Sequence, residues 1–379
     1  MRAYKISISD AKKVYKNLNC DSGGISILSK KSKLHTLYIK DMHVGAANIL
    51  KQDALSIGAE FAVPTGVIVA KEKLVDGILI GTTKHFELLS RKELPQPFGL
   101  KELSKTLKKF VKEQNYETKI MGVLNANEDS FFSGSRFDDK QASFRIESMI
   151  EDGANIIDIG AVSSRPGSQT VEDSVELERI KSIVDTIYTN KYFEKVDFSI
   201  DSYSPLVIDY VLNKGFKIVN DITGLSNDEV CNVSAKYDAQ VVIMHMQNNP
   251  TNMQDNPEYE NIMLDLDEYF KTQIQKAQSF GINDIVLDVG IGFGKTLEHN
   301  LTLLKNMEHF KHFGYEVLIG ASRKSMIDKI TPCEIQDRLP GTLAIHLEAV
   351  KNGASIVRCH DVKEHHQALK VLEAINSIN

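Results

Sequence analysis

Cysteine is scarce in this chain and follows no recognisable pattern. The 379 residues include four cysteines, none of them in a C-x-x-C pair: Cys20, Cys231, Cys333 and Cys359. Disulfide frameworks and cysteine zinc sites need cysteines at short, regular spacings. The pattern therefore argues against both and favours reduced thiols in a cytoplasmic protein.

Long apolar runs and a strong charge of either sign are also missing. No stretch approaches the roughly 18 apolar residues that a membrane span requires. Residues 1–5 lack the apolar core of a signal peptide. The formal net charge of -6 at pH 7 gives no reason to expect a nucleic-acid partner. We therefore expect neither a membrane nor nucleic acid among the partners of this protein.

The chain is long and apolar enough to favour two domains, since 42% of its residues are hydrophobic. Residues 1–115 predict a small α+β domain, with helical spacing over 44–57 and over the Lys-rich segment 100–114. Short apolar segments predict strands at 37–39, 61–63, 66–70 and 77–80. No chemical motif marks this domain, so a cap, a partner surface and a dimer contact all remain open as its role.

From residue 119 onward, eight apolar segments recur at a regular interval. They begin roughly 34 residues apart on average, which leaves room for a strand and a crossover helix. The segments are 119–126, 155–162, 195–201, 217–223, 239–246, 284–290, 316–322 and 355–361. Near-continuous apolar strands are typical of sheets covered on both faces. We predict a (β/α)8 TIM barrel over residues 116–379, with an open doubly wound sheet as the alternative.

Five of these segments follow a glycine at the end of a helical stretch. The five glycines are Gly153, Gly215, Gly281, Gly314 and Gly353, and each strand begins within two to four residues. Glycine readily adopts the left-handed conformation that ends a helix. The spacing therefore predicts five helix-to-strand junctions.

Polar side chains stand at the C-terminal end of every predicted barrel strand. In a barrel these ends meet at one face, where barrel enzymes hold their chemistry. The residues are Asn125, Ser163, Ser164, Arg165, Asp201, Asn220, Asp221, His245, Asp288, Ser322, Arg323, Lys324, Arg358, His360 and Asp361. Any one of them has an ordinary explanation, such as turn chemistry for an Asn-Asp pair. The inference of a single site depends on the whole set.

The set divides into two chemical kinds. Sheltered donors and acceptors suit a flat heteroaromatic ring with amide and amino edges, and these are Asp201, Asn220, Asp288 and Lys324. A cationic, amide-rich rim suits phosphate or pyrophosphate, and its members are Asn125, Ser164, Arg165, Arg358 and His360. We infer a ligand with both a ring and a phosphate. The alternative is a set of ion pairs that only ties the barrel rim together.

The loop after Asp288 is rich in glycine but does not match a nucleotide P-loop. Glycine lets the backbone approach a ligand closely, and the loop ends in Gly294-Lys295-Thr296. A Walker sequence requires a glycine where Val289 stands. H-E-x-x-H, EF-hand and cysteine metal motifs are missing as well. A Mg2+ ion held by one side-chain oxygen, water and substrate phosphates needs no such motif.

In sequence order, these motifs resemble those of the dihydropteroate synthases of the folate pathway. The resemblance covers about residues 119–365, nearly the whole predicted barrel. The matching stretches are 120–125 with 129–131, 158–160 with 163–167, 199–201, 219–221, 244–246, 288–296, 320–324 and 358–361. Each motif is weak alone, and eight in the expected order make the resemblance specific.

The resemblance implies a transferase that joins 4-aminobenzoate to 6-hydroxymethyl-7,8-dihydropterin diphosphate, which gives 7,8-dihydropteroate and diphosphate. By position, the pterin would be held by Asp201, Asn220, Asp288 and Lys324. The diphosphate would be held by Asn125 together with Mg2+, and by Ser164, Arg358 and His360. The 4-aminobenzoate side would be shaped by Arg165, Pro166, Phe293, Ser322 and Lys324. The catalytic groups would be Asp288, Lys324, Arg358 and His360. A homodimer and sensitivity to sulfonamides, which mimic 4-aminobenzoate, are implied too.

The chain departs from the family pattern at several positions, most of all in the first loop. Ala126-Asn127-Glu128 stands where Val-Thr-Pro is usual, and Val289 replaces a common proline. Two alternatives therefore remain: a pterin-binding relative that has lost turnover, and a methyltetrahydrofolate-type methyltransferase on a similar barrel. The intact set of site residues argues against the first. The second has no diphosphate to bind, so Arg358 and His360 argue against it.

Overall fold

The structure is a computed structural model that describes residues 1–8, 10–112, 114–126, 139–162, 171–248 and 252–378. It divides into two compact units. One comprises Met1–Gln114 with Glu373–Asn379, and the other is Asn115–Leu372. Among the described residues, no helix combines the length and the apolar character needed to cross a membrane.

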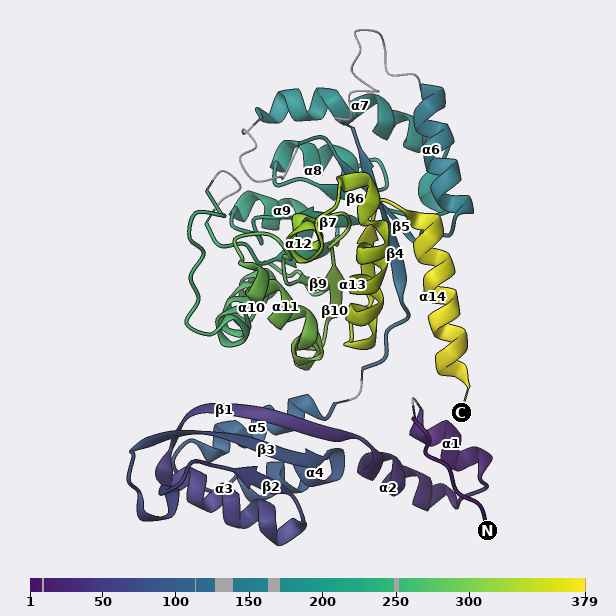
Figure 1. The fold of residues 1–379 in the computed structure, drawn as a ribbon. Coiled ribbons are helices and arrows are strands. Elements are labelled where there is room, and N and C mark those ends of the chain that lie inside the picture. Colours follow the sequence, from purple (N-terminus) through teal and green to yellow (C-terminus); the bar gives the residue numbers. More distant parts are fainter. Residues whose placement is uncertain (9, 113, 127–138, 163–170, 249–251, 379) are drawn as a thin grey trace. The chain divides into compact units, whose positions relative to one another are not determined.

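The N-terminal unit is built on a three-stranded antiparallel sheet in the order β1-β3-β2 (Figure 1). Its strands are β1 (Leu34–His43), β2 (Glu60–Ala62) and β3 (Leu74–Thr82). Its helices are α1 (Ala11–Asn17), α2 (Ser22–Ser32), α3 (Val44–Ile57), α4 (Thr83–Lys92) and α5 (Leu100–Phe110). Ala47, Leu50 and Ala54 recur at helical spacing on α3 and are fully buried, which gives this unit a hydrophobic core of its own.

Three of the four strands predicted in this unit are confirmed, and the fourth is wrong. Residues 66–70 hold a 3-10 turn, η1 (Val67–Val69), instead of a strand. Gly66 and Ala70 on either side have φ of 93° and 52°, so the backbone cannot run extended through them. The predicted helix over 44–57 is confirmed as α3. The Lys-rich helix ends at Phe110 instead of residue 114.

The second unit is a closed, fully parallel barrel in the order β10-β11-β4-β5-β6-β7-β8-β9. Its strands are β4 (Lys119–Asn125), β5 (Ile156–Gly160), β6 (Asp197–Asp201), β7 (Ile218–Asp221), β8 (Gln240–Met244), β9 (Ile285–Asp288), β10 (Glu316–Ile319) and β11 (Ile356–Cys359). Each lies within a predicted apolar segment. The (β/α)8 barrel is therefore confirmed, and the open sheet is excluded because the order closes on itself.

Helices surround this barrel (Figure 1). They are α6 (Asp139–Glu151), α7 (Asp173–Thr189), α8 (Pro205–Leu212), α9 (Asp228–Lys236), α10 (Ile262–Ser279), α11 (Leu297–Lys305), α12 (Ser325–Ile330), α13 (Leu339–Lys351) and α14 (Val362–Ser377). Short 3-10 segments are η2 (Tyr192–Glu194), η3 (Met307–Phe313) and η4 (Ile335–Arg338). Outward strand residues such as Ile157, Phe198 and Ile243 are fully buried in the layer between strands and helices.

The barrel interior begins with a layer of apolar side chains. Seven strands contribute one each: Met121, Ile156, Ile218, Val242, Val286, Leu318 and Ile356. These residues form a cluster separate from the outer core, as expected for side chains that fill the inside of an eight-stranded barrel. We call this layer the apolar floor, and the polar residues nearer the strand ends lie directly above it.

The five predicted junction glycines are confirmed as left-handed. Their φ values lie between 88° and 99°. Four of them follow α6, α8, α10 and α13, and the fifth ends η3. This conformation is unfavourable for residues that carry a Cβ, which explains why glycine recurs at these junctions.

Gly281 offers a clean test of that constraint, because a Cβ built there meets no atom within 4 Å. We expect Gly281→Ala to lower the free energy of unfolding by about 1 kcal/mol through backbone strain alone. Gly281→Asn should lose less, since asparagine tolerates the left-handed region. Denaturant unfolding of the full chain measures both. Wild-type stability in the alanine variant would contradict the explanation.

Candidate active site at the mouth of the barrel

The polar residues of the site form the layer directly above the apolar floor. Asp158, Asn220, Asp288 and Arg358 each stand two residues after a member of the floor. Side chains alternate between the faces of a strand, so all four point into the barrel. The register of β6 and β7 also brings Asp201 directly beside Asn220.

Arg358 joins three strands through its guanidinium. Its Nε donates to Asp158 Oδ2 at 2.7 Å, and its Nη2 donates to Asp201 Oδ2 at 2.6 Å. Asn220 Nδ2 donates to the same oxygen of Asp158 at 3.1 Å. Burial by itself lowers the pKa of Arg358, but the two carboxylates outweigh burial and raise that pKa above its ordinary value. Arg358 is therefore a permanent positive charge inside the barrel.

Asp158 was not among the residues predicted to bind a ligand. Its side chain is fully buried, and its Oδ1 has no hydrogen-bond partner among the described residues. A buried acceptor without a donor is unfavourable, so a ligand N–H in the barrel mouth would satisfy it. The sequence does hold a signal for Asp158. In four strands an apolar residue is followed, two positions later, by a polar residue: 156–158, 218–220, 286–288 and 356–358.

The charges of Asp288 and Lys324 influence each other's pKa. Asp288 Oδ1 accepts the N–H of Gly290 at 2.8 Å. Burial raises the pKa of Asp288, while Gly290, Lys324 and Arg358 act in the opposite direction. The ammonium of Lys324 donates to the Ile291 carbonyl and lies 4.0 Å from the centre of the Phe293 ring. Burial lowers the pKa of Lys324 to about 7, although Asp288 opposes this shift.

The glycine-rich loop wraps over a buried lysine. Gly290, Gly292 and Gly294 all have positive φ, and a Cβ on Gly290 would lie 2.0 Å from the His245 carbonyl oxygen. Lys295 Nζ lies below, donating to the carbonyls of Phe293 and His245 at 2.9 and 3.1 Å. Lys295 therefore fastens the loop to the end of β8. It does not reach outward to a phosphate as a P-loop lysine does.

The remaining predicted residues fall into three groups. Ser322 and His360 follow adjacent strands, and Ser322 Oγ lies 2.9 Å from His360 Nδ1. Asn125 is the last residue of β4 and is half-buried. Ser164, Arg165 and Pro166 lie outside the described residues. The contacts thus bring together Asp201 and Arg358, Phe293 and Lys324, and Ser322 and His360.

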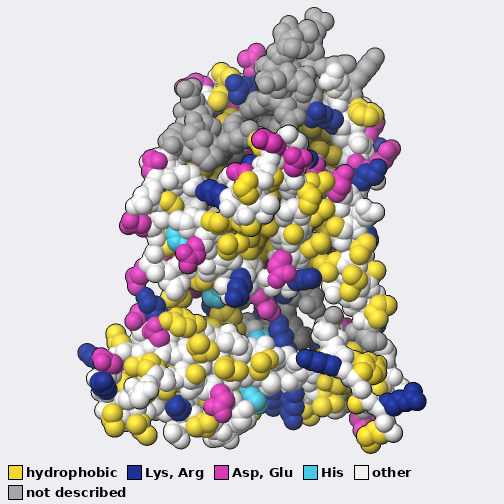
Figure 2. Space-filling model, in the orientation of Figure 1, with side chains coloured by type: hydrophobic (Ala, Val, Ile, Leu, Met, Phe, Trp, Pro, Cys, Tyr) yellow, Lys and Arg dark blue, Asp and Glu magenta, His cyan; other side chains and the backbone are white. Residues whose placement is uncertain are grey.

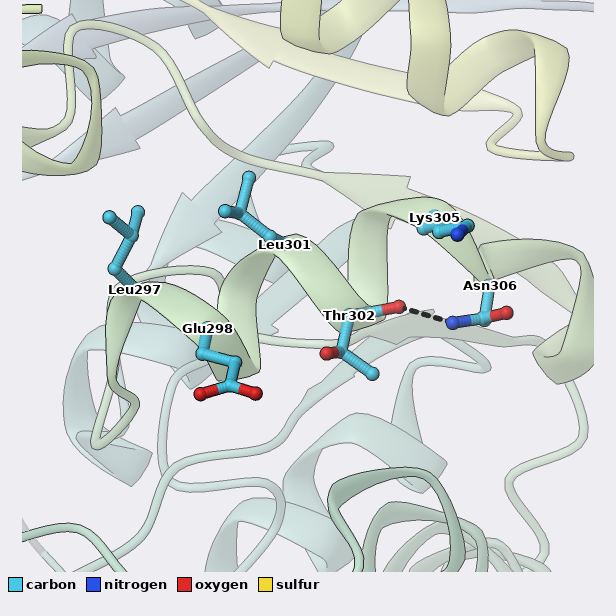
Figure 3. A pocket seen from close by; sticks show the side chains of 6 residues that line it. All are labelled: Leu297, Glu298, Leu301, Thr302, Lys305 and Asn306. Carbon is cyan, nitrogen blue, oxygen red and sulfur yellow. Dashed lines mark hydrogen bonds between the residues drawn. The ribbon is translucent and has the colours of Figure 1, made fainter. Parts of the chain in front are cut away.

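Outside the strand ends, one surface hollow lies along α11 (Figure 3). It is lined by Leu297, Glu298, Leu301, Thr302, Lys305 and Asn306. Asn306 Nδ2 donates to the Thr302 carbonyl at 2.8 Å, a bond within the same helical segment. None of the predicted site residues lines this hollow. On the face shown in Figure 2, acidic and basic side chains are interspersed and do not gather into a patch of one sign.

Carboxylates, an amide and two cations lie at the carboxyl ends of the strands of this parallel barrel. Barrel enzymes hold their catalytic residues at this end. The sequence profile of a family described as pterin binding enzyme matches residues 121–360. A bifunctional dihydropteroate synthase/dihydropteroate reductase from Helicobacter pylori is 42% identical over 338 residues, 89% of each chain. The dihydropteroate synthase of Escherichia coli is 40% identical over 258 residues, 67% of this chain and 90% of that one.

Solved structures agree with these relatives. A dihydropteroate synthase from Clostridium difficile, crystallised in the presence of pteroic acid, is 37% identical with a TM-score of 0.63. The match covers 69% of this chain and 99% of that one. A dihydropteroate synthase from Thermus thermophilus in complex with 4-aminobenzoate is 33% identical with a TM-score of 0.61, over 68% and 95% of the two chains. The chain therefore belongs to the pterin-binding enzymes and, among them, to the dihydropteroate synthases, which are transferases.

With the pterin contacts that the family resemblance implies for Asp201 and Lys324, the pKa values of these two residues predict how pterin affinity depends on pH. Burial raises the pKa of Asp201 to about 7 against the opposing charge of Arg358, and Lys324 also titrates near 7. As pH falls through 7, Asp201 takes up a proton and loses the negative charge that strengthens the hydrogen bonds it accepts. As pH rises through 7, Lys324 loses its charge. Affinity for 6-hydroxymethyl-7,8-dihydropterin, measured by calorimetry between pH 6 and 9, should therefore peak near neutrality.

The variant Lys324→Gln separates the two effects. It should bind the pterin more weakly at pH 7 and should lose the alkaline decline, while the acid decline due to Asp201 remains. An unchanged alkaline decline in this variant would show that another group causes it.

Proposed function

We propose that the barrel catalyses attack of the 4-aminobenzoate amine on the methylene of 6-hydroxymethyl-7,8-dihydropterin diphosphate. A C–N bond forms, the C–O bond to diphosphate breaks, and the amine loses a proton. The observation that carries this proposal is the buried polar layer. It offers carboxylate oxygens to the N–H groups of a flat ring and cations to a negatively charged leaving group.

The pterin is proposed to lie on the polar layer with its N–H edges toward the carboxylates. Asp201, Asn220 and Asp288 supply the predicted contacts, and the unpartnered Oδ1 of Asp158 adds an acceptor at the same depth. A buried carboxylate that accepts N–H donors regains the interactions that it lost with water. Lys324, whose charge acts on Asp288, adds a donor next to the Phe293 ring.

Charge stabilisation is the main catalytic effect in this proposal. The electron-rich pterin can carry positive charge on its methylene while diphosphate leaves, and the negative charge of Asp288 favours that cation. Arg358 and His360 are assigned to the growing negative charge on diphosphate. In the structure, the guanidinium of Arg358 donates to the carboxylates of Asp158 and Asp201. The aniline nitrogen is neutral at pH 7, so the site needs positioning more than a strong base.

The predicted metal fits the donor set at the end of β4. Asn125 offers an amide oxygen, which is a ligand type that Mg2+ accepts alongside water and phosphate oxygens. When bound, Mg2+ would neutralise charge on the diphosphate. Ser164 is assigned to the diphosphate, and Arg165 and Pro166 to 4-aminobenzoate, by resemblance alone. Phe293 and Ser322 complete the aminobenzoate side, which is also the proposed site of sulfonamide binding.

We further infer a cytoplasmic homodimer. All four cysteines are free in the structure, as expected in a reducing compartment. The dimer follows from family resemblance. The small-molecule partners are the two substrates and their products.

Asp288→Asn tests the proposed role of that carboxylate. The substitution keeps the shape and the bond from the Gly290 N–H but removes the charge. We expect pyrophosphate release from the pterin diphosphate and 4-aminobenzoate to fall at least about 100-fold, in line with loss of electrostatic stabilisation of a transition state. Circular dichroism should show an unchanged fold. In the wild type, a sulfonamide should compete with 4-aminobenzoate.

Near-normal release by Asp288→Asn would rule out its catalytic role. Binding of the pterin diphosphate by the wild type without any release would instead favour the relative that has lost turnover. The comparisons, which lead to synthases, weigh against the methyltransferase alternative.

A second activity is suggested by the extent of one match. The Helicobacter pylori relative, named a synthase and a reductase, matches 338 residues of this chain. The barrel region, residues 115–379, is shorter than the 338 matched residues, so the match must extend into the N-terminal unit. The Escherichia coli synthase matches only 258 residues. We propose that the chain also reduces the C=N bond of dihydropteroate, with a hydride from a reduced nicotinamide or flavin and a proton from water.

The full chain, given dihydropteroate and NADPH with or without added flavin, should consume NADPH and form tetrahydropteroate, detected by mass spectrometry. Asp288→Asn should keep this activity while it loses synthase activity, if the N-terminal unit carries the reduction. A wild-type preparation that makes dihydropteroate but never consumes NADPH would contradict the second activity and leave the first intact.

A further inference from the structure

A compact group of three metal-ligand side chains lies outside the active site, where α10 packs against η3. Its members are Asp267 on α10 and His309 and His312 on η3. Their ligand atoms all lie within 4.8 Å of one another. Asp267 Oδ1 is 3.0 Å from His309 Nε2 and 3.1 Å from His312 Nε2. Both imidazoles thus present the same nitrogen to one carboxylate oxygen.

Local geometry and packing fix this convergence. In a 3-10 helix, side chains three residues apart line up on one face, so His309 and His312 point in the same direction from η3. Phe270 lies one helical turn after Asp267 and packs edge-on against Phe310 and against Phe313, with centroid distances of 5.6 and 6.2 Å. Phe270 and Phe310 are fully buried. The two backbones that carry the ligands are therefore held together by a rigid apolar contact.

The hydrogen bond that His312 makes with the backbone shows which of its ring nitrogens faces Asp267. Its Nδ1 lies 2.7 Å from the His309 carbonyl oxygen, and a carbonyl can only accept, so the Nδ1 must carry a hydrogen. His312 therefore faces Asp267 with Nε2, the ring nitrogen through which it would bind a metal ion, at 3.1 Å.

We propose that Asp267, His309 and His312 bind one zinc ion. Zinc takes imidazole nitrogen and carboxylate oxygen at about 2.0–2.2 Å in a tetrahedron, which places ligand atoms about 3.4 Å apart. The observed 3.0 and 3.1 Å need only a small outward movement. The Nδ1 bond of His312 to a backbone carbonyl is the outer contact that commonly orients a zinc-binding histidine.

The site is accessible and distinct from the synthase chemistry. The Asp267 side chain is 31% exposed, whereas His312 is 7% exposed, so an ion has a path from solvent to a mostly enclosed position. Water fills the fourth position of the tetrahedron. The site ties α10 to the segment that leads into β10, which makes it a stabilising clip between neighbouring βα units.

The experiment measures zinc binding to the full chain by competition with a chromophoric chelator at pH 7.5. The wild type should bind one zinc per chain at this site. Asp267→Asn, His309→Ala and His312→Ala should each weaken that binding at least tenfold, and zinc should raise the unfolding midpoint of the wild type but not of these variants.

Two matched controls should retain wild-type zinc binding. Glu268→Gln removes the neighbouring exposed carboxylate. His299→Gln removes a histidine on α11, and glutamine at this position can preserve the capping box with Thr296. Equal zinc binding in the wild type and all three ligand variants would overturn the proposal, as would no zinc binding by the wild type. Anomalous diffraction at the zinc edge on wild-type crystals decides the matter without any variant: a peak must lie among the three side chains, and its absence from them overturns the site.

Discussion

The ion pair network of Arg358 is the interaction on which the proposed pterin site depends. One guanidinium lies between Asp158 and Asp201, which come from different strands. Buried carboxylates tend to take up protons and so lose the negative charge that makes them strong acceptors. Even beside Arg358, burial raises the pKa of Asp201 to about 7. Without that guanidinium, Asp201 would take up a proton still more readily and would be a weaker acceptor at neutral pH.

The network also explains how a packed barrel can hold a polar site. The apolar floor fills the lower interior, and the next inward position of four strands is polar. Charges there are expensive to bury unless they are paired. The chain satisfies most of them with one another and leaves a few oxygens, such as Asp158 Oδ1, without a described donor. A ligand therefore enters a site whose charges are already held in place.

The glycine loop beside Asp288 completes the site by close backbone approach. Its positive φ values let the Gly290 N–H turn back to the carboxylate. The loop is held from below by Lys295 and from the side by Tyr259, which donates to the Gly294 carbonyl at 2.7 Å. The buried lysine has a pKa well below its ordinary value because of burial. Lys295 therefore stabilises the glycine-rich loop and does not bind a phosphate as a P-loop lysine does.

The sequence predicts the barrel well, because glycine junctions and apolar strands are local signals that each repeat carries independently. It also predicts which residues stand at strand ends. It does not show which side chains pair, since the contact of Arg358 with Asp158 spans 200 positions. The incorrect strand at 66–70 has a similar cause: its apolar composition suits a strand, but left-handed residues at both ends turn the backbone.

We infer that the polar layer above the apolar floor is the pterin site. A crystal structure of the full chain with bound pteroate tests it most directly. Ring nitrogens should lie within hydrogen-bond distance of the carboxylates of Asp288 and Asp201, and Asp158 Oδ1 should accept a hydrogen bond from the ligand. A ring bound elsewhere, with the contacts of Arg358 and the lone oxygen of Asp158 unchanged, would contradict it.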